Sequence, residues 1–224
     1  MRRASEIINA EQRSRIESAV SAAESKTCCE IVPVVATVSG RYDRAEDLVG
    51  LWCAVLGGVG VFLTFSGHTD AGRWGGIPIW GQVVFLAIVL LLCFVAGATL
   101  ADRLHALRRL FTPRQQMKEE VNLRARELFF DRRVHHTAGA SGLLIFVSLY
   151  ERMAVVLGDR SVVGALGPTF CEDLCQRLTT SLRNEDVAAA ICDTIHHAAA
   201  SLESALPRTA GDVNELPDTL VLLD

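Results

Sequence analysis

Residues 48–67 read LVGLWCAVLGGVGVFLTFSG, and residues 77–101 read IPIWGQVVFLAIVLLLCFVAGATLA. Both runs lie in the middle of the 224-residue chain, and neither contains Asp, Glu, Lys or Arg. Each run is as long as the roughly 20 apolar residues that a helix needs to cross a bilayer. Neither carries a charge that would need a partner inside lipid. The sequence therefore predicts an integral membrane protein with a transmembrane helical hairpin.

Neither a signal peptide nor a soluble core accounts for these runs. The first run begins only at residue 48, after a charged segment, so it is not a cleavable signal peptide. A soluble protein would have to bury both helices, and about 180 residues outside the runs are too few to do so.

The charges beside the runs predict the orientation. Arginines precede the first run and follow the second, at positions 41, 44, 103, 108 and 109, whereas the loop 68–76 holds only Arg73. Basic residues that flank spans favour the cytoplasmic side. We therefore expect a multi-pass protein of the cell inner membrane, in contact with membrane lipid, with both termini in the cytoplasm.

Composition excludes some partners and predicts no disulfides. Half of the residues are hydrophobic and the net charge is −4, which gives no electrostatic reason to bind nucleic acid. The seven cysteines are an odd number, and Cys53 and Cys93 lie inside the runs. The other five fall in segments expected to be cytoplasmic, where thiols stay reduced.

The segments on both sides of the hairpin predict helices and strands. A charged segment with helical apolar spacing, 5–25, precedes a β-branched run at 30–38. Pro33 lies inside that run and cannot donate to a ladder, so the strand should have an edge or a bulge there. Beyond the hairpin we expect a helix at 103–130, strands at 143–149 and 152–157, and helices at 169–182 and 185–206. The two later strands should pair as an antiparallel hairpin.

One strand before the membrane hairpin and two after it predict a single split domain. A lone strand cannot form a sheet, and isolated hairpins are marginal. We therefore expect residues 5–47 and 102–206 to form one α/β domain, interrupted by the transmembrane hairpin 48–101. Residues 207–224 contain Pro, Gly, Asn and Asp and are expected to be a flexible tail.

Two blocks of the chain resemble the bacterial TPM-domain family. The first comprises IESAVSAAE at 16–24, EIVPVV at 30–35 and Arg41-Tyr42. The second comprises GLLIFVSLYER at 142–152 and VVLGDR at 155–160. In the membrane-embedded branch of the family, two spans separate the blocks, as here. The chain departs from the family pattern at 138–141, where an Arg is expected, and at Cys28-Cys29.

The resemblance implies a fold and several possible roles. The fold is a three-layer α/β/α sandwich with a small mixed sheet. Most bacterial members have no assigned function, whereas a plant relative is linked to photosystem II repair and proposed as a weak acid phosphatase. Some members bind a divalent cation through acidic residues. A small membrane protein of the LemA type is a plausible partner by family analogy.

Acidic residues near strand ends are the candidate metal ligands. Glu30 begins the first strand, Asp43 and Asp47 precede the first span, and Asp159 follows the last strand. Carboxylates that converge can bind Ca²⁺ or Mg²⁺, and a metal site at Glu30, Asp43 and Asp159 is one hypothesis. Solvated carboxylates are the alternative, because the sequence has no Asp-x-Asp pair and no phosphate loop.

Cysteine and histidine give weaker candidates. Cys171, Cys175, Cys192 and His196 have the spacing of a two-helix zinc site, but they lie in apolar stripes where free cysteine packs as a small hydrophobe. The pairs His135-His136 and His196-His197 lie near Asp131 and Asp193, as a general base requires. No elbow motif marks a nucleophile, and we expect Ser148 to satisfy its hydroxyl locally. No catalytic residue is assigned.

The sequence thus favours a membrane protein that presents a cytoplasmic TPM-like α/β domain for protein interaction, self-association or assembly of a membrane complex. The alternative is a weak divalent-cation-dependent phosphatase that uses clustered carboxylates. A transporter is disfavoured, because neither run contains an ionisable residue.

Overall fold

A computed structural model describes residues 3–40, 42–66, 79–103, 112–137, 139–209 and 213–224. Its contacts divide the chain into two compact units, Met1–Gly40 with Met117–Asp224, and Arg41–Gln116. The first unit is therefore built from both sides of the second. The helix expected at 103–130 is found only over its later part, and residues 104–111 lie outside the described range.

A four-stranded mixed sheet forms the centre of the first unit. Its strands are β1 (Glu30–Ala36), β2 (Gly142–Ser148), β3 (Met153–Gly158) and β4 (Val221–Leu223), in the order β3-β2-β1-β4. β1 pairs in parallel with β2 along its whole length, from Glu30 opposite Gly142 to Ala36 opposite Ser148. β2 and β3 form the predicted antiparallel hairpin, with a wider turn than the two residues between the apolar runs indicate.

The C-terminal strand corrects the prediction of a flexible tail. β4 pairs in parallel with Val34–Ala36 of β1, and Leu220, just before it, is buried. Pro and Gly in the segment indicated a tail, but its last apolar residues complete the sheet. The turn-forming residues lie before residue 220, and the prediction overlooked the apolar residues that follow them and form β4.

The position of Pro33 agrees with the predicted edge. Backbone N–H groups alternate between the two sides of a strand, and the N–H of Glu30 donates to Ser141 O on the β2 side at 3.0 Å. Pro33 therefore faces the β4 side, where β4 pairs only from Val34 onward. The missing donor removes no ladder hydrogen bond.

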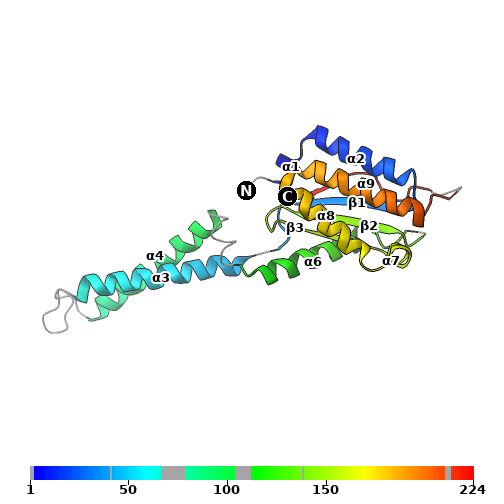
Figure 1. The fold of residues 1–224 in the computed structure, drawn as a ribbon. Coiled ribbons are helices and arrows are strands. Elements are labelled where there is room, and N and C mark those ends of the chain that lie inside the picture. Colours follow the sequence, from blue (N-terminus) through cyan, green and yellow to red (C-terminus); the bar gives the residue numbers. More distant parts are fainter. Residues whose placement is uncertain (1–2, 41, 67–78, 104–111, 138, 210–212) are drawn as a thin grey trace. The chain divides into compact units, whose positions relative to one another are not determined.

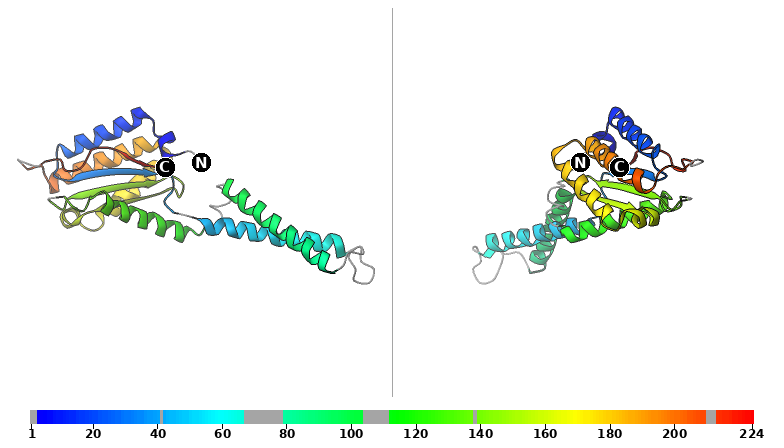
Figure 2. Two further views of the ribbon diagram at one scale, coloured as in Figure 1. Left: turned by 180° about the vertical axis from the view of Figure 1, so that it is seen from behind. Right: turned by 45° about the vertical axis from the view of Figure 1, so that its right-hand side comes forward.

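Helices cover the two faces of the sheet unequally, which confirms the α/β/α class (Figure 1). The elements on the first face are α1 (Ala4–Ile7), α2 (Ala10–Glu24), α7 (Arg160–Leu166), α8 (Phe170–Asn184) and α9 (Val187–Ala205). Only α6 (Arg114–Asp131) packs on the second face in the described part of the chain. Both views in Figure 2 keep α2 and α9 on the opposite side of the sheet from α6.

The sequence pattern explains these helices and also where the prediction differs. The N-terminal helix is split at Ile8 and Asn9, because Asn9 accepts from the N–H of Gln12 and caps α2 while Gln12 reaches back to the N–H of Asn9. The helix α7 is an addition to the predicted elements. Asp159 caps it by accepting from the N–H of Arg160.

The second unit is a pair of long apolar helices. α3 (Asp43–Ser66) begins in the polar segment before the first run and continues into it, and α4 (Ile79–Arg103) contains most of the second run. Gly57 faces Cys93, and Gly97 faces Cys53, so closely that a Cβ on either glycine would lie within 2.8 Å of a cysteine atom. These glycines bring the two helix backbones together.

Gly142 is a test of the close packing at the start of β2. A Cβ on Gly142 would lie 2.0 Å from the carbonyl oxygen of Val134, whereas one on Gly164 in α7 would meet nothing within 4 Å. We expect Gly142→Ala to lower the free energy of unfolding by about 1–3 kcal/mol. Gly164→Ala should leave it unchanged or raise it by up to about 1 kcal/mol. Urea unfolding in mild detergent, followed by circular dichroism, measures both. Equal effects of the two substitutions would contradict this packing.

Candidate functional site

Glu30, the first predicted ligand, forms hydrogen bonds with the C-terminal segment, residues 213–224. The residue begins β1 and is only 6% exposed. Its Oε1 accepts from the N–H of Glu215 at 3.1 Å, and its Oε2 accepts from the N–H of Leu216 at 3.2 Å. Both carboxylate oxygens therefore hold the chain that leads to β4.

Asp159, the second predicted ligand, lies at the same end of the strands as Glu30 but does not contact it. Its N–H donates to the carbonyl of Gly142 at 2.8 Å, and Gly142 is the register partner of Glu30. β2 therefore lies between the two acidic residues. One carboxylate oxygen of Asp159 caps α7 through Arg160 at 2.7 Å, and the other is buried without a hydrogen-bond partner.

The third predicted ligand belongs to the other unit. Asp43 is the first residue of α3, and its side chain lies outside the described residues. Within the described ranges, no group of three His, Cys, Asp or Glu side chains has the arrangement of a metal site. Binding of Ca²⁺ or Mg²⁺ at these three positions stays a prediction.

Glu24 is the most unusual acidic residue of the domain. It lies at the end of α2, is 8% exposed, and accepts from the N–H of Ile31 at 2.8 Å. The amide of Asn214 donates to its other oxygen at 3.3 Å and also donates to Asp218. We call Glu24, Glu30, Asn214 and Asp218 the acidic cluster. A cavity of about 110 Å³ beside it is also lined by Thr27 and Arg208.

The surroundings of Glu24 favour its protonated form. Burial raises the pKa of this carboxyl to about 8, and the nearby charges of Glu30 and Asp218 also raise it, against the N–H of Ile31, which lowers it. A neutral Glu24 can donate its proton to Asp218. The cluster can therefore hold a proton under conditions in which an exposed glutamate is ionised.

The side chains with the spacing of a zinc site lie on two different interfaces, and those of α8 pack against β3, as the apolar stripe indicated. Cys171 and Cys175 of α8 face β3: a Cβ on Gly158 would lie 3.0 Å from the sulfur of Cys171, and Cys175 Sγ donates to Ala154 O at 3.1 Å. Cys192 and His196 instead line a groove between α2 and α9. The four side chains do not come together.

The two thiols of α8 protect the open edge of the sheet. β3 is an edge strand, and the N–H of Asp159 points toward β2, so the backbones of Gly158 and Val156 point away from it. Burial raises the pKa of both thiols, and hydrogen bonds from Gly158 to Cys171 and from Val156 to Cys175 partly offset that effect. These bonds satisfy groups that an unprotected edge would present to other chains.

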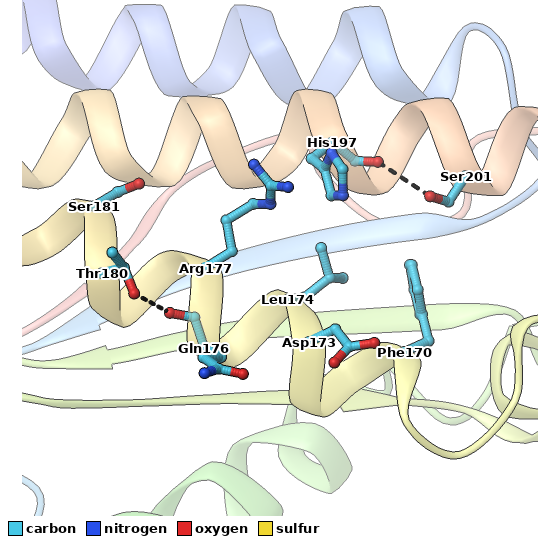
Figure 3. A pocket seen from close by; sticks show the side chains of 9 residues that line it. All are labelled: Phe170, Asp173, Leu174, Gln176, Arg177, Thr180, Ser181, His197 and Ser201. Atoms are coloured by element: carbon cyan, nitrogen blue, oxygen red, sulfur yellow. Dashed lines mark hydrogen bonds between the residues drawn. The ribbon is translucent and has the colours of Figure 1, made fainter.

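A groove runs between α8 and α9 of the first unit (Figure 3). It measures about 700 Å³ and is open to solvent. Arg177 and Leu174 point from α8 toward α9, and the imidazole of His197 points from α9 toward α8. Asp193, the expected partner of a histidine base, lines the other groove with His196. The lining of the groove between α8 and α9 is mixed polar and apolar, and the hydroxyl of Ser201 donates to the backbone carbonyl of His197 at 3.4 Å, not to its imidazole.

The remaining candidates have structural partners. Ser148 donates to Glu151, and Ser39 Oγ donates to Ser148 at 2.7 Å, which agrees with the expected local satisfaction of this hydroxyl. The ring of His135 packs edge-on against Phe130, with centroids 4.7 Å apart. The buried Glu151 also accepts from the N–H of Ser39 at 2.9 Å and ties the hairpin turn to the end of β1.

Comparison with known proteins identifies a fold relative. The chain is similar to the NMR structure of the BA42 protein from the psychrophilic bacterium Bizionia argentinensis, with a TM-score of 0.58 and 16% sequence identity. The similarity covers 99% of each chain. At this level of identity the likeness shows the α/β fold alone. No protein-family model matches the chain, and no curated protein matches it.

The sequence did not predict the acidic cluster. Glu24 lies within a helix and seven residues before Ile31, and Asn214 and Asp218 lie about 190 residues later, in the segment expected to be a tail. The available signal was the apolar run 220–223, which could have been interpreted as a strand. Such a strand would have brought its preceding polar residues to the sheet.

Cys175 tests the protection of the β3 edge. In Cys175→Val the carbonyl of Ala154 and the N–H of Val156 lose their partner, so we expect about 1–3 kcal/mol less stability and a greater tendency to aggregate. Cys175→Ser keeps a donor and an acceptor and should remain close to the wild type. Urea unfolding and light scattering measure the two effects. A Val variant as stable and soluble as the Ser variant would show that the thiol is only a space filler.

Proposed function

We propose that this chain is an integral membrane protein whose helices α3 and α4 span the bilayer and whose α/β domain binds other proteins at the membrane. The domain would be a TPM-like domain on the cytoplasmic side. Its partner would be another membrane protein or a second copy of the chain, and its role the assembly or maintenance of a membrane complex.

The membrane part of the proposal is supported by the surface of the second unit. The stretches Asp47–Thr64 and Trp80–Ala101 are long and apolar enough to cross a membrane. Only 17% and 6% of these stretches are buried, so their apolar side chains are not part of a soluble core. Lipid would cover side chains such as Leu56 and Leu63, which are 65% and 67% exposed.

The interaction part is carried by the second face of the sheet. α6 covers the sheet with Met117, Val121, Ala125 and Leu128, but Leu123 and Phe130, two turns apart on the same helix, are 56% and 60% exposed. Beside α6, the apolar side chains of β3 that face this side are half-buried; they are Met153, Val155 and Leu157. Leu123 and Phe130 thus form an exposed apolar stripe on the outer side of α6, away from the sheet, and an exposed apolar stripe on a helix can bind another protein.

The TPM assignment and the orientation have separate support. Most of the residues that resemble the family, 16–24, 30–35, 142–148 and 155–158, lie in α2, β1, β2 and β3, which belong to the observed sheet and its first helix layer. The parallel pairing of β1 with β2 requires both flanks of the hairpin to reach one domain. Two spans satisfy that requirement, and the flanking arginines favour the cytoplasm.

A phosphatase is the weaker proposal. It would need Glu30 and Asp159 to share a cation, but Glu30 accepts two backbone N–H groups and Asp159 caps α7, with β2 between them. The open groove between α8 and α9 places Arg177 near His197 without a nucleophile. These contacts favour binding over chemistry.

A photo-crosslinking amino acid in place of Leu123 tests the interaction face in native membranes. We expect an adduct when the probe replaces Leu123 or Phe130, and none when it replaces Glu11, which is exposed on α2. An adduct of twice the chain mass would identify self-association, and another mass a second protein. The chain should also stay in the pellet after alkaline carbonate extraction. Equal crosslinking from positions 11 and 123 would contradict an interface on α6, and release by carbonate would contradict the spans.

A further inference from the structure

The C-terminal segment is attached to the domain at both of its ends. At its far end, Asp224 accepts from the N–H and the hydroxyl of Ser5 at 3.1 and 2.6 Å, and the carbonyl of Leu223 accepts from the N–H of Thr37 at 2.8 Å. Glu30 binds its backbone at Glu215 and Leu216, and β4 adds a ladder of three residues to β1. Glu17 of α2 accepts from the N–H of Leu220 at 3.3 Å. Val221, Leu222 and Leu223 are each only half-buried. A change of charge in the acidic cluster acts on the attachment at Glu215 and Leu216, whereas the bonds of Leu223 and Asp224 lie outside that cluster.

Three carboxyl groups from three elements meet beneath this segment. Glu24 comes from α2, Glu30 from β1 and Asp218 from the segment itself. The amide of Asn214 donates to Glu24 and Asp218. The side chain of Arg208 also lines the cavity beside the acidic cluster. The amide of Asn214 is shared between Glu24 and Asp218, and the charges of Glu30 and Asp218 raise the pKa of Glu24, so the closed arrangement is most stable when Glu24 is neutral.

Glu24 is the acid that best holds the proton. It is more than nine-tenths buried, and Asp218, which is half-buried, is the acceptor within reach. Glu30 has both oxygens engaged by N–H donors, which favour its ionised form. Glu24 and Glu30 are fixed in the frame of the domain. Only the segment that carries Asp218 can move away when all three are charged.

We propose that residues 213–224 are a proton-dependent latch, which is closed over the edge of β1 when Glu24 carries a proton and opens when Glu24 ionises. The opening is local and leaves β1, β2 and β3 paired. It uncovers the side of β1 that β4 occupies, an edge to which an extended segment of another chain can add. The latch acts within the domain whichever partner the domain binds.

Linkage gives the direction and size of the effect. In the closed state the pKa of Glu24 is about 8, and in the open state water reaches the carboxyl and its pKa returns toward that of an exposed glutamate, about 4.3. Between those values only the closed state holds the proton, so a rise in pH favours opening. The open fraction grows about tenfold per pH unit in that window. It is constant below the window and constant above it.

Hydrogen exchange of the full chain in mild detergent tests the latch. Exchange is followed by mass spectrometry from pH 5.5 to 8.5 and corrected for the intrinsic pH dependence of amide exchange. We expect the protection of residues 213–224 to fall about tenfold per pH unit up to about pH 8, while residues 142–148 of β2 keep theirs. Pulsed labelling at one pH after incubation at the others gives an independent reading.

Matched variants separate the proton of Glu24 from other causes. Glu24→Gln imitates the neutral acid, since its oxygen can accept from Ile31 and its amide can donate to Asp218, so its protection should not depend on pH. Glu11→Gln, on the exposed face of α2, should behave as the wild type. Asp218→Asn removes one charge that raises the pKa of Glu24. The pKa of Glu24 in the closed state should therefore fall, and the rise in opening with pH should end at a lower pH. A pH-independent wild type, an unchanged slope in Glu24→Gln, or simultaneous loss of protection in β2 would each overturn the latch.

Discussion

The parallel pairing of β1 with β2 is the constraint on which the rest of this structure depends. Seven consecutive residue pairs join strands that are 112 positions apart, and the two apolar helices lie within the connection between them. Parallel neighbours always need a crossover, and here the crossover includes a pair of long apolar helices. An even number of spans returns the chain to the side from which it left. The pairing therefore requires one domain to be built from both sides of the pair of apolar helices, which agrees with the two spans we propose.

The same pairing leaves two edges that the chain treats differently. On the β3 side, Cys171 and Cys175 of α8 lie along the strand, and their half-buried thiols form hydrogen bonds with its backbone. On the β1 side, the C-terminal segment supplies β4 and is held over an acidic cluster. The protonation of a thiol whose pKa is raised changes little with pH near neutrality. The protonation of a glutamate with a pKa of about 8 changes strongly there. One edge is thus closed permanently, and the other is closed conditionally.

The local sequence pattern was enough to predict three of the four strands. The acidic cluster could not be predicted, because it depends on contacts between residues about 190 positions apart. The β-branched residues of β1 and the run GLLIFVS of β2 identify buried strands, and the turn at Tyr150-Glu151 identifies the hairpin. Asn9 and Asp159, which cap α2 and α7, were visible as residues but not as helix starts. Glu24 and Asp218 are ordinary acids in sequence, and only the return of β4 to β1 brings them together. We predicted a metal site at Glu30, Asp43 and Asp159 from their positions near the ends of predicted strands and helices. Such positions do not predict which N–H groups donate to each carboxylate.

A disulfide across β1 and β2 tests most directly that the two halves form one sheet. Val35 and Val147 are register partners, and Val35→Cys with Val147→Cys is introduced into a chain that carries a protease site between positions 67 and 78. After oxidation in membranes and cleavage at that site, we expect the two fragments to stay linked until a reductant is added. The wild type with the same protease site, and Val35→Cys paired with Phe146→Cys on the opposite face, should separate. Fragments that separate in the register pair, or that stay linked equally in the off-register pair, would contradict the split domain.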